Sequence, residues 1–298
     1  MRIGITGASG FLGGEILSQA VDKGWKVVAF SRSDKPIPGA EEVRTLEDRE
    51  KIDLSELDAV IHLAGEPIVG LWTKEKKRRI HESRVDLTQD LVEAFERISR
   101  SRRPSVFVSA SAVGFYGDRG DEWLDEESDL GFGFLPEVCR DWERTAEEAT
   151  RLGVRVVTPR IGIVLGQEGF LKRLRPVFRM GLGGRLGSGK QWMSWIHVQD
   201  LAGIFLTCVE ETTIHGRVNC VSPEPIQNRD FTRTYAKLLK RSAWFPVPKF
   251  VLNRLPGGMS ELFLASQRVD PVVARAFRYE YRFPDLTSAI QEIESARR

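Results

Sequence analysis

Apolar and polar positions divide the chain into two parts. In residues 1–165, short apolar runs are separated by stretches whose apolar residues recur at helical spacing. The short runs predict strands at 2–6, 26–30, 59–63, 106–109 and 154–158. The helical spacing predicts helices at 11–23, 85–98 and 135–152. Strands and helices that alternate in this order form a parallel sheet covered on both faces, so we predict an α/β fold of the doubly wound Rossmann type.

The pattern changes in residues 166–298. Glycines stand among aromatic and basic residues between 166 and 195, and segments with glycine and proline recur around 222–228 and 245–258. We predict a smaller, irregular C-terminal domain at 166–298, with some of its segments returning to the Rossmann domain at 1–165.

Charge and hydropathy exclude several classes of protein. The 298 residues include 44 basic and 42 acidic ones, a net charge of +2. This balance argues against a surface built as a whole for nucleic acid or an anionic membrane, so we expect neither partner. No apolar run approaches the roughly 18 residues that cross a bilayer, and the first apolar run is too short for a signal peptide.

Cysteine and histidine usage points to no metal and no disulfide framework. Cys139, Cys208 and Cys220 are scattered, and the four histidines have no metal-type spacing. We therefore expect a reducing, cytoplasmic compartment.

A glycine loop follows the first predicted strand. Thr6 is followed by glycines at 7, 10 and 13, and a helix is predicted from residue 11. Gly7 permits a tight turn, Gly10 lets a pyrophosphate approach the backbone, and Gly13 lets the helix pack close to the sheet. The N-terminus of the helix then offers free N–H groups to the phosphates. This loop predicts a dinucleotide site.

The end of the second predicted strand indicates which dinucleotide. An NAD enzyme usually has an acidic residue there, which binds the ribose hydroxyls. This chain has Ser31 and Arg32 instead, and Arg32 can pair with a 2′-phosphate. We therefore expect NADP, although Asp34, two residues later, leaves NAD open.

These motifs resemble an extended short-chain dehydrogenase/reductase, and more narrowly an atypical subgroup of NADP-binding epimerase family proteins. The resemblance covers nearly the whole chain. The motifs that carry it are the glycine spacing, residues 58–65 and 107–111, Ser83-Arg84, Trp142-Glu143, residues 181–189, Trp195-Ile196-His197, residues 266–271 and residues 283–286.

The resemblance implies contacts for the cofactor. Ser31 and Arg32 would hold the 2′-phosphate, Arg84 would contact the cofactor, and Ile163 would lie beside the nicotinamide. The residues implied at the pyrophosphate are Gly7, Ser9, Gly10, Phe11, Leu12 and Gly13. Those implied along the adenine-ribose side are Leu63, Ala64 and Gly65. Analogy with extended relatives adds the expectation of a homodimer.

The mechanism of the short-chain dehydrogenases that this chain resembles needs a tyrosine and a lysine four residues apart on one helix, and a serine on the neighbouring strand. Ser109 and Ser111 stand where the serine belongs. The segment 134–143, where the pair belongs, contains neither tyrosine nor lysine. This departure puts ordinary reductase or epimerase chemistry in doubt and leaves the catalytic residues unknown.

Several residues are candidate substitutes. Ser111, Tyr116 and His197 are catalytic candidates. Two of them also have a structural interpretation: a loop tyrosine for Tyr116 and a packing histidine for His197. Cys139 fits a buried helix face better than a nucleophile. The other residues weighed are Arg140, which would depress the pKa of Tyr116, and the carboxylates Asp141 and Glu143.

The segment 181–195 is a candidate substrate wall. It combines glycines with Arg185, Lys190, Trp192 and Trp195, which suits an anionic or sugar-like ligand. Two functions remain open. The first is an atypical NADP-dependent oxidoreductase or nucleotide-sugar epimerase-like enzyme acting on an unidentified small molecule. The alternative is a non-catalytic NADP(H) sensor that reports to a partner.

Overall fold

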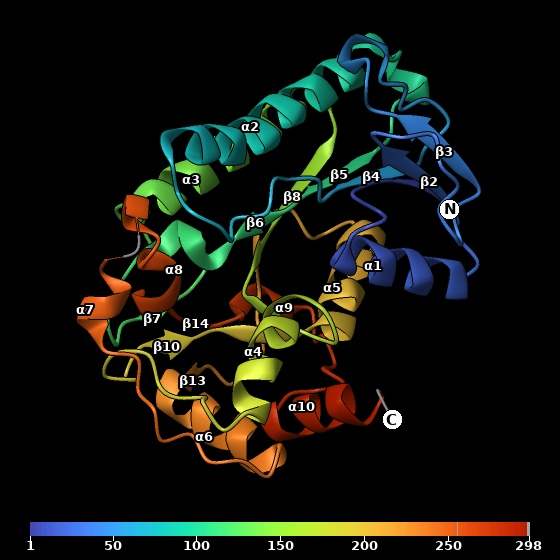
Figure 1. Cartoon of the computed structure of the whole chain (residues 1–298). Coiled ribbons are helices and arrows are strands. Elements are labelled where there is room, and N and C mark those ends of the chain that lie inside the picture. Colours follow the sequence, from blue (N-terminus) through green and yellow to red (C-terminus); the bar gives the residue numbers. More distant parts are fainter. Residues whose placement is uncertain (255, 297–298) are drawn as a thin grey trace.

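The computed structural model describes residues 1–254 and 256–296. Its central feature is a parallel sheet with the strand order β12-β8-β5-β4-β1-β2-β3, and β6 also pairs with β8 (Figure 1). The strands of this sheet are β1 (Arg2–Thr6), β2 (Lys26–Ser31), β3 (Glu42–Thr45), β4 (Ala59–His62), β5 (Val106–Ser109), β6 (Ser111–Ala112), β8 (Arg155–Ile161) and β12 (Gly216–Cys220). The order reverses beside β1, which confirms the predicted doubly wound α/β fold.

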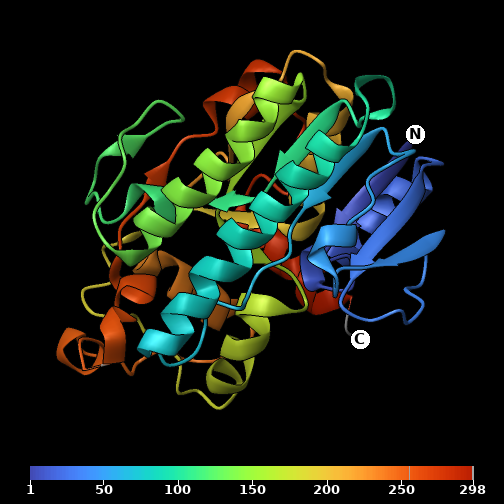
Figure 2. The same ribbon diagram turned by 90° about the horizontal axis from the view of Figure 1, so that it is seen from above.

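Helices cover both faces of the sheet. The helices on one face are α1 (Phe11–Asp22) and α5 (Val198–Glu210). Those on the other are α2 (Lys74–Arg97) and α3 (Phe134–Glu147), which lie side by side in Figure 2. The central strands β1, β4, β5 and β8 are almost fully buried, because each face is covered by apolar residues of the helices, whereas the edge strand β3 is only partly buried.

The rest of the chain forms a smaller region below the sheet in Figure 1, around its own apolar core. Its helices are α4 (Gly169–Arg179), α6 (Asn228–Leu238), α7 (Lys249–Leu252), α8 (Glu261–Leu264), α9 (Val272–Ala276) and α10 (Leu286–Ser295). Its short strands are β7 (Trp123–Leu124), β9 (Ile163–Leu165), β10 (Trp192–Met193), β11 (Trp195–His197), β13 (Ile226–Gln227) and β14 (Arg268–Val269). Segments 198–210 and 216–220, from the second half of the chain, return to the large sheet.

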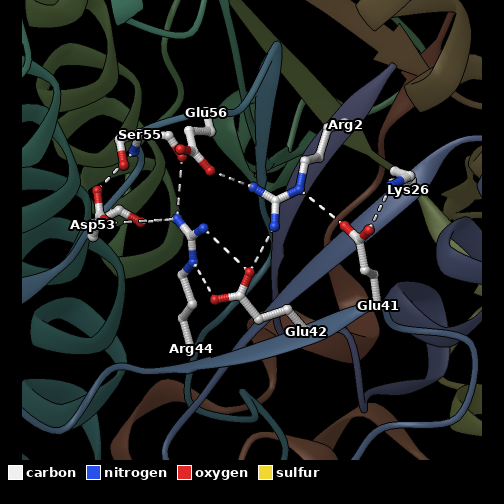
Figure 3. Close-up of polar contacts among 8 residues, drawn as sticks. All are labelled: Arg2, Lys26, Glu41, Glu42, Arg44, Asp53, Ser55 and Glu56. Atoms are coloured by element: carbon white, nitrogen blue, oxygen red, sulfur yellow. Dashed lines mark hydrogen bonds and ion pairs between the residues drawn. The ribbon is translucent and has the colours of Figure 1, made fainter.

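Helix α2 and strand β3 are among the elements that differ from the sequence-based predictions. Helix α2 begins at Lys74 rather than 85, capped by Thr73, because its first three turns are charged and carry little apolar periodicity. Strand β3 has no predicted counterpart, because its four residues have no apolar alternation. Its edge is instead tied by ion pairs: Glu42 bridges Arg2 and Arg44 at 2.7 and 2.9 Å (Figure 3). Charged side chains on an edge strand also discourage pairing with other chains.

Candidate functional site

The glycine loop between β1 and α1 has the geometry of a phosphate-binding turn. Gly7 has a φ of +75°, a conformation that favours glycine. A Cβ on Gly13 would lie 2.1 Å from the Gly7 carbonyl oxygen, so only glycine lets the helix pack on the loop. Gly10 is the N-cap of α1 and provides no side-chain cap, which leaves the N–H groups of the first turn available to an anion.

Thr6 joins this loop to the end of the neighbouring strand β4. Its Oγ1 lies 2.7 Å from His62 Nδ1 and accepts hydrogen bonds from the N–H groups of Leu63 and Ala64 at 3.0 and 3.2 Å. The Thr6 hydroxyl therefore donates to Nδ1, which requires an imidazole with Nδ1 unprotonated. Burial lowers the pKa of His62 to about 3, with a smaller contribution from the charge of Arg84, so this histidine is neutral at physiological pH.

Arg84 holds the loop that follows β4. Its Nη1 donates to the carbonyl oxygens of Glu66 and Ile80 at 3.0 and 3.1 Å, and its guanidinium lies over the Trp142 ring at 5.3 Å. A Cβ on Gly65 would lie 3.1 Å from Arg84 Cζ, so glycine permits the close approach. Arg84 thus positions the loop of Leu63–Gly65, whose residues stand beside the glycine loop; its contact with a cofactor stays a prediction.

A cavity of about 430 Å³ lies between the glycine loop and the tip of β2. Among its lining residues are Ser9, Ser31, Ser33 and Lys35. Ser33 and Lys35 were not among the sequence-based candidates, although both stand within three residues of Arg32. Arg32 itself is exposed on the strand tip. The Glu66–Lys76 hydrogen bond chiefly holds the pKa of Glu66 below its usual range, and Arg32 is near enough to contribute. The cavity wall combines three serine hydroxyls with the cation of Lys35, which suits a phosphorylated ribose.

The start of the smaller region packs onto the glycine loop. A Cβ on Gly166 would lie 2.4 Å from the ring of Phe11, the first residue of α1. Three residues before Gly166, Ile163 pairs in parallel register with Trp195. The structure therefore brings Ile163 to the same side of the molecule as the glycine loop. Trp195, by contrast, is a buried core residue, and its indole N–H donates to Glu224 O at 2.9 Å.

Ser111 and Tyr116 belong to a buried polar network. Ser111 Oγ donates to Glu143 Oε1 at 2.6 Å, and Arg160 holds both oxygens of the same carboxylate at 2.9 Å. Arg160 Nη1 also donates to the Tyr116 hydroxyl at 3.0 Å, and that hydroxyl lies 2.7 Å from Asn219 Oδ1. Burial raises the pKa of Tyr116 to about 12, and no residue of this network is more than a few per cent exposed.

Arg160 is not among the residues that the sequence predicts to be functional. It stands in β8 among Val156, Val157 and Ile161, and a charged residue inside such an apolar strand signals a buried partner. The partner, Glu143, was weighed as a carboxylate base. Its two oxygens are instead fully engaged by Arg160 and Ser111.

The remaining catalytic candidates are either buried or paired with a neighbouring charge. Cys139 is buried, and burial raises its pKa to about 12, which disfavours the nucleophilic thiolate. Asp141 pairs on the helix surface with Arg140 at 2.8 Å, so Arg140 does not face Tyr116 as a free cation. In the part of the chain that the structure describes, no group of three metal-type ligands comes together.

His197 joins the two regions of the molecule. It is the N-cap of α5, where Nδ1 accepts from the Gln199 N–H at 3.3 Å, and Nε2 lies 3.1 Å from Glu292 Oε2 on α10. The ring packs on Phe283 with centroids 4.0 Å apart. Because Nδ1 accepts, Nε2 carries the proton and donates to Glu292. Burial lowers the pKa of His197 to about 4, so the ring is neutral in the folded protein.

We therefore predict that His197→Asn reduces stability in a pH-dependent way. Unfolding lets His197 take up a proton below a pH of about 6.5, so its contribution is complete above that pH and is lost as pH falls toward 4. Urea unfolding at pH 7.5 and pH 5 should show the gap between wild type and variant shrinking by about 2 kcal/mol at the lower pH. Asparagine keeps the N-cap, so a gap independent of pH would mean that only the packing against Phe283 matters.

Comparisons with known proteins agree with this geometry. Residues 3–220 match the model of the NAD dependent epimerase/dehydratase family, and residues 247–293 match a domain of unknown function, DUF1731. The chain is 36% identical to the Arabidopsis thaliana epimerase family protein SDR39U1 homolog, chloroplastic, over 98% of this chain and 86% of the relative. It is 31% identical to the epimerase family protein YfhF of Bacillus subtilis, over 100% of this chain and 99% of the relative.

A solved structure extends the likeness to three dimensions. The crystal structure of human epimerase family protein SDR39U1 (isoform 2) with NADPH matches with a TM-score of 0.90 and 32% identity, over 99% of both chains. These findings confirm the family resemblance and the fold that the sequence predicts.

Proposed function

Because the chain belongs to the NAD dependent epimerase/dehydratase family, we propose that it is an NADP(H)-dependent oxidoreductase or epimerase-like enzyme acting on a small molecule. The observation that carries the cofactor assignment is the turn from β1 to α1, where Gly7, Gly10 and Gly13 leave a helix N-terminus open to an anion. The human relative's structure with NADPH supports the same assignment.

The residues present fit NADP. The first turn of α1 would bind the pyrophosphate, and Ser31, Arg32 and Lys35 would surround the 2′-phosphate at the tip of β2. No carboxylate stands at positions 31–33 to repel that phosphate. The Leu63–Gly65 loop would lie along the adenine-ribose side, held from behind by Arg84.

When bound, the nicotinamide supplies or accepts a hydride. The protein would contribute orientation, and the glycine-rich segment 181–189 is the candidate wall at which backbone groups and Arg185 would meet a ligand. Helix α3 contains no tyrosine or lysine, and Ser111 and Tyr116 keep their protons in the buried network. The proton would therefore come from the substrate pocket itself, through solvent or a group on the substrate.

Arg32→Ala should weaken NADPH binding by about 10- to 100-fold, the value of one lost charge-assisted contact of about 1.5–3 kcal/mol. NADH binding should stay within about twofold, because NADH has no 2′-phosphate for Arg32 to contact. Titrations that follow nicotinamide fluorescence measure both. Asp34→Ala is the matched control, an exposed neighbour whose removal leaves NADPH affinity undiminished. Equal losses for the two cofactors after Arg32→Ala would contradict the 2′-phosphate assignment.

One observation favours a second function, a non-catalytic NADP(H) sensor: the hydroxyls of Ser111 and Tyr116 are committed to buried partners. An assay for turnover distinguishes the enzyme from the sensor. The NADPH-loaded protein is mixed with pools of carbonyl compounds and sugar nucleotides, while nicotinamide absorbance and the configuration of the sugars are followed. Oxidation of NADPH, or epimerisation without net oxidation, supports the enzyme. Tight binding with neither reaction supports the sensor.

A further inference from the structure

An exposed apolar face lies on the smaller region, away from the parallel sheet. Trp244 is 78% exposed, Met180 66%, Phe250 62% and Phe245 61%. Half of the large apolar side chains that are exposed on the described residues stand in the two short segments 177–182 and 244–251. Their members are Val177, Met180, Leu182, Trp244, Phe245, Phe250 and Val251, which we call the aromatic face.

The two segments lie against each other. Arg241 Nε donates to Arg179 O at 2.9 Å, and the Val247 N–H donates to Arg185 O at 2.9 Å. A Cβ on Gly184 would lie 1.8 Å from Phe245 O, so the two backbones touch. The end of α4 and the segment leading into α7 are therefore neighbours, and both carry exposed apolar side chains. An apolar area of this kind marks an interaction site.

Basic residues predominate in the two stretches of chain that carry the aromatic face. Residues 169–199 and 231–260 contain 12 basic residues and no acidic one, whereas the remaining 237 residues contain 32 basic and 42 acidic ones. Four of the twelve pair with a carboxylate: Lys172, Arg175, Arg179 and Arg233. The other eight have no carboxylate within ion-pair distance among residues 1–254 and 256–296. The net charge of +2, from which we expected no membrane partner, averages over this asymmetry.

We propose that the aromatic face docks on an anionic lipid surface. Exposed tryptophan and phenylalanine are suited to the boundary between headgroups and acyl chains, and the surrounding lysines and arginines are attracted to anionic headgroups. No helix among the described residues is long and apolar enough to cross a bilayer, so the contact is a surface one.

Two other occupants fit the face less well. A nucleic acid would stack its bases on aromatic rings, but Val177, Met180, Leu182 and Val251 offer aliphatic surface that does not stack. A second copy joined through the same face would bring two sets of positive charges together, at an electrostatic cost. An anionic lipid surface matches both the aliphatic and the basic components.

The test is sedimentation of the full chain with vesicles of phosphatidylcholine alone, or of phosphatidylcholine and phosphatidylglycerol in equal parts. We expect binding to the anionic vesicles only, weakened by added salt. The double substitution Trp244→Ser with Phe245→Ser should lower the partition coefficient at least about tenfold. Lys240→Gln with Lys249→Gln should lower it about fivefold for each charge removed.

Phe132→Ser is the matched control, because Phe132 is 98% exposed and lies outside the aromatic face. It should bind vesicles as wild type does. All altered side chains are exposed, and thermal unfolding checks that each variant is folded. The proposal is wrong if anionic vesicles do not sediment the protein, if both vesicle types bind equally, or if the Trp244/Phe245 variant binds as wild type. It is also wrong if single-stranded DNA displaces the protein from the vesicles through the same residues.

Discussion

Gly10→Val is expected to lower the affinity for NADPH at least about a hundredfold while the protein stays folded. A Cβ at position 10 meets, within 4 Å, only the Gly7 carbonyl oxygen, at 3.1 Å, so we expect the fold to survive with a backbone shift of a few tenths of an ångström. The valine methyl groups would occupy the space through which a pyrophosphate approaches the first turn of α1. Loss of two charge-assisted hydrogen bonds, each about 1.5–3 kcal/mol, accounts for the expected change in Kd.

Ser18→Val separates this effect from the cost of a β-branched residue in a helix. Ser18 is exposed on the same helix, α1, two turns further along. Isothermal titration with NADPH should give this control the wild-type Kd, and thermal unfolding should show all three proteins folded. Wild-type affinity in Gly10→Val would show that the glycine loop is not the dinucleotide site.

The second large effect is on stability, at the buried pair of Glu143 and Arg160. Glu143→Ala should cost about 3–5 kcal/mol of unfolding free energy, because it leaves the Arg160 guanidinium buried without its partner. Ser111 would lose its acceptor as well. Urea unfolding monitored by tryptophan fluorescence measures the difference.

The same helix provides the control. Glu147 lies one turn beyond Glu143, is about half exposed, and is 3.7 Å from Arg217. Glu147→Ala should cost less than about 1 kcal/mol, as for exposed ion pairs in general. Replacing Glu143 and Arg160 together by methionine should recover much of the stability lost in Glu143→Ala. If Glu143→Ala were no more costly than Glu147→Ala, the buried network would not stabilise the fold.

The sequence predicts the sheet and the phosphate loop well, because both rest on local chemistry. Buried strands require continuous apolar residues, and a turn at the Gly7 φ of +75° favours glycine. Strand β3 and the first turns of α2 were missed because ion pairs and a Thr73 cap stabilise them rather than apolar burial. The ion pair of Glu42 with Arg2 joins residues far apart in sequence, and the Thr73 cap adds no apolar residue, so the apolar periodicity reports neither contact.

In the candidate site, too, some residues can be predicted from the sequence and others depend on distant partners. The residues of the glycine loop and the β2 tip follow from their spacing, since each acts through its own backbone or one nearby group. The surroundings of Ser111, Tyr116 and His197 depend on distant partners: Glu143, Asn219 and Glu292. Those partners commit the three side chains to buried contacts, an arrangement that only the three-dimensional structure reveals.

The most direct test of this account is the ratio of the Kd values of the wild-type protein for NADH and NADPH, measured by isothermal titration in one buffer. We expect NADPH to bind at least about tenfold more tightly, because the proposed function has Arg32 and Lys35 contact the 2′-phosphate through charge-assisted hydrogen bonds. Equal affinities, or tighter binding of NADH, would contradict it.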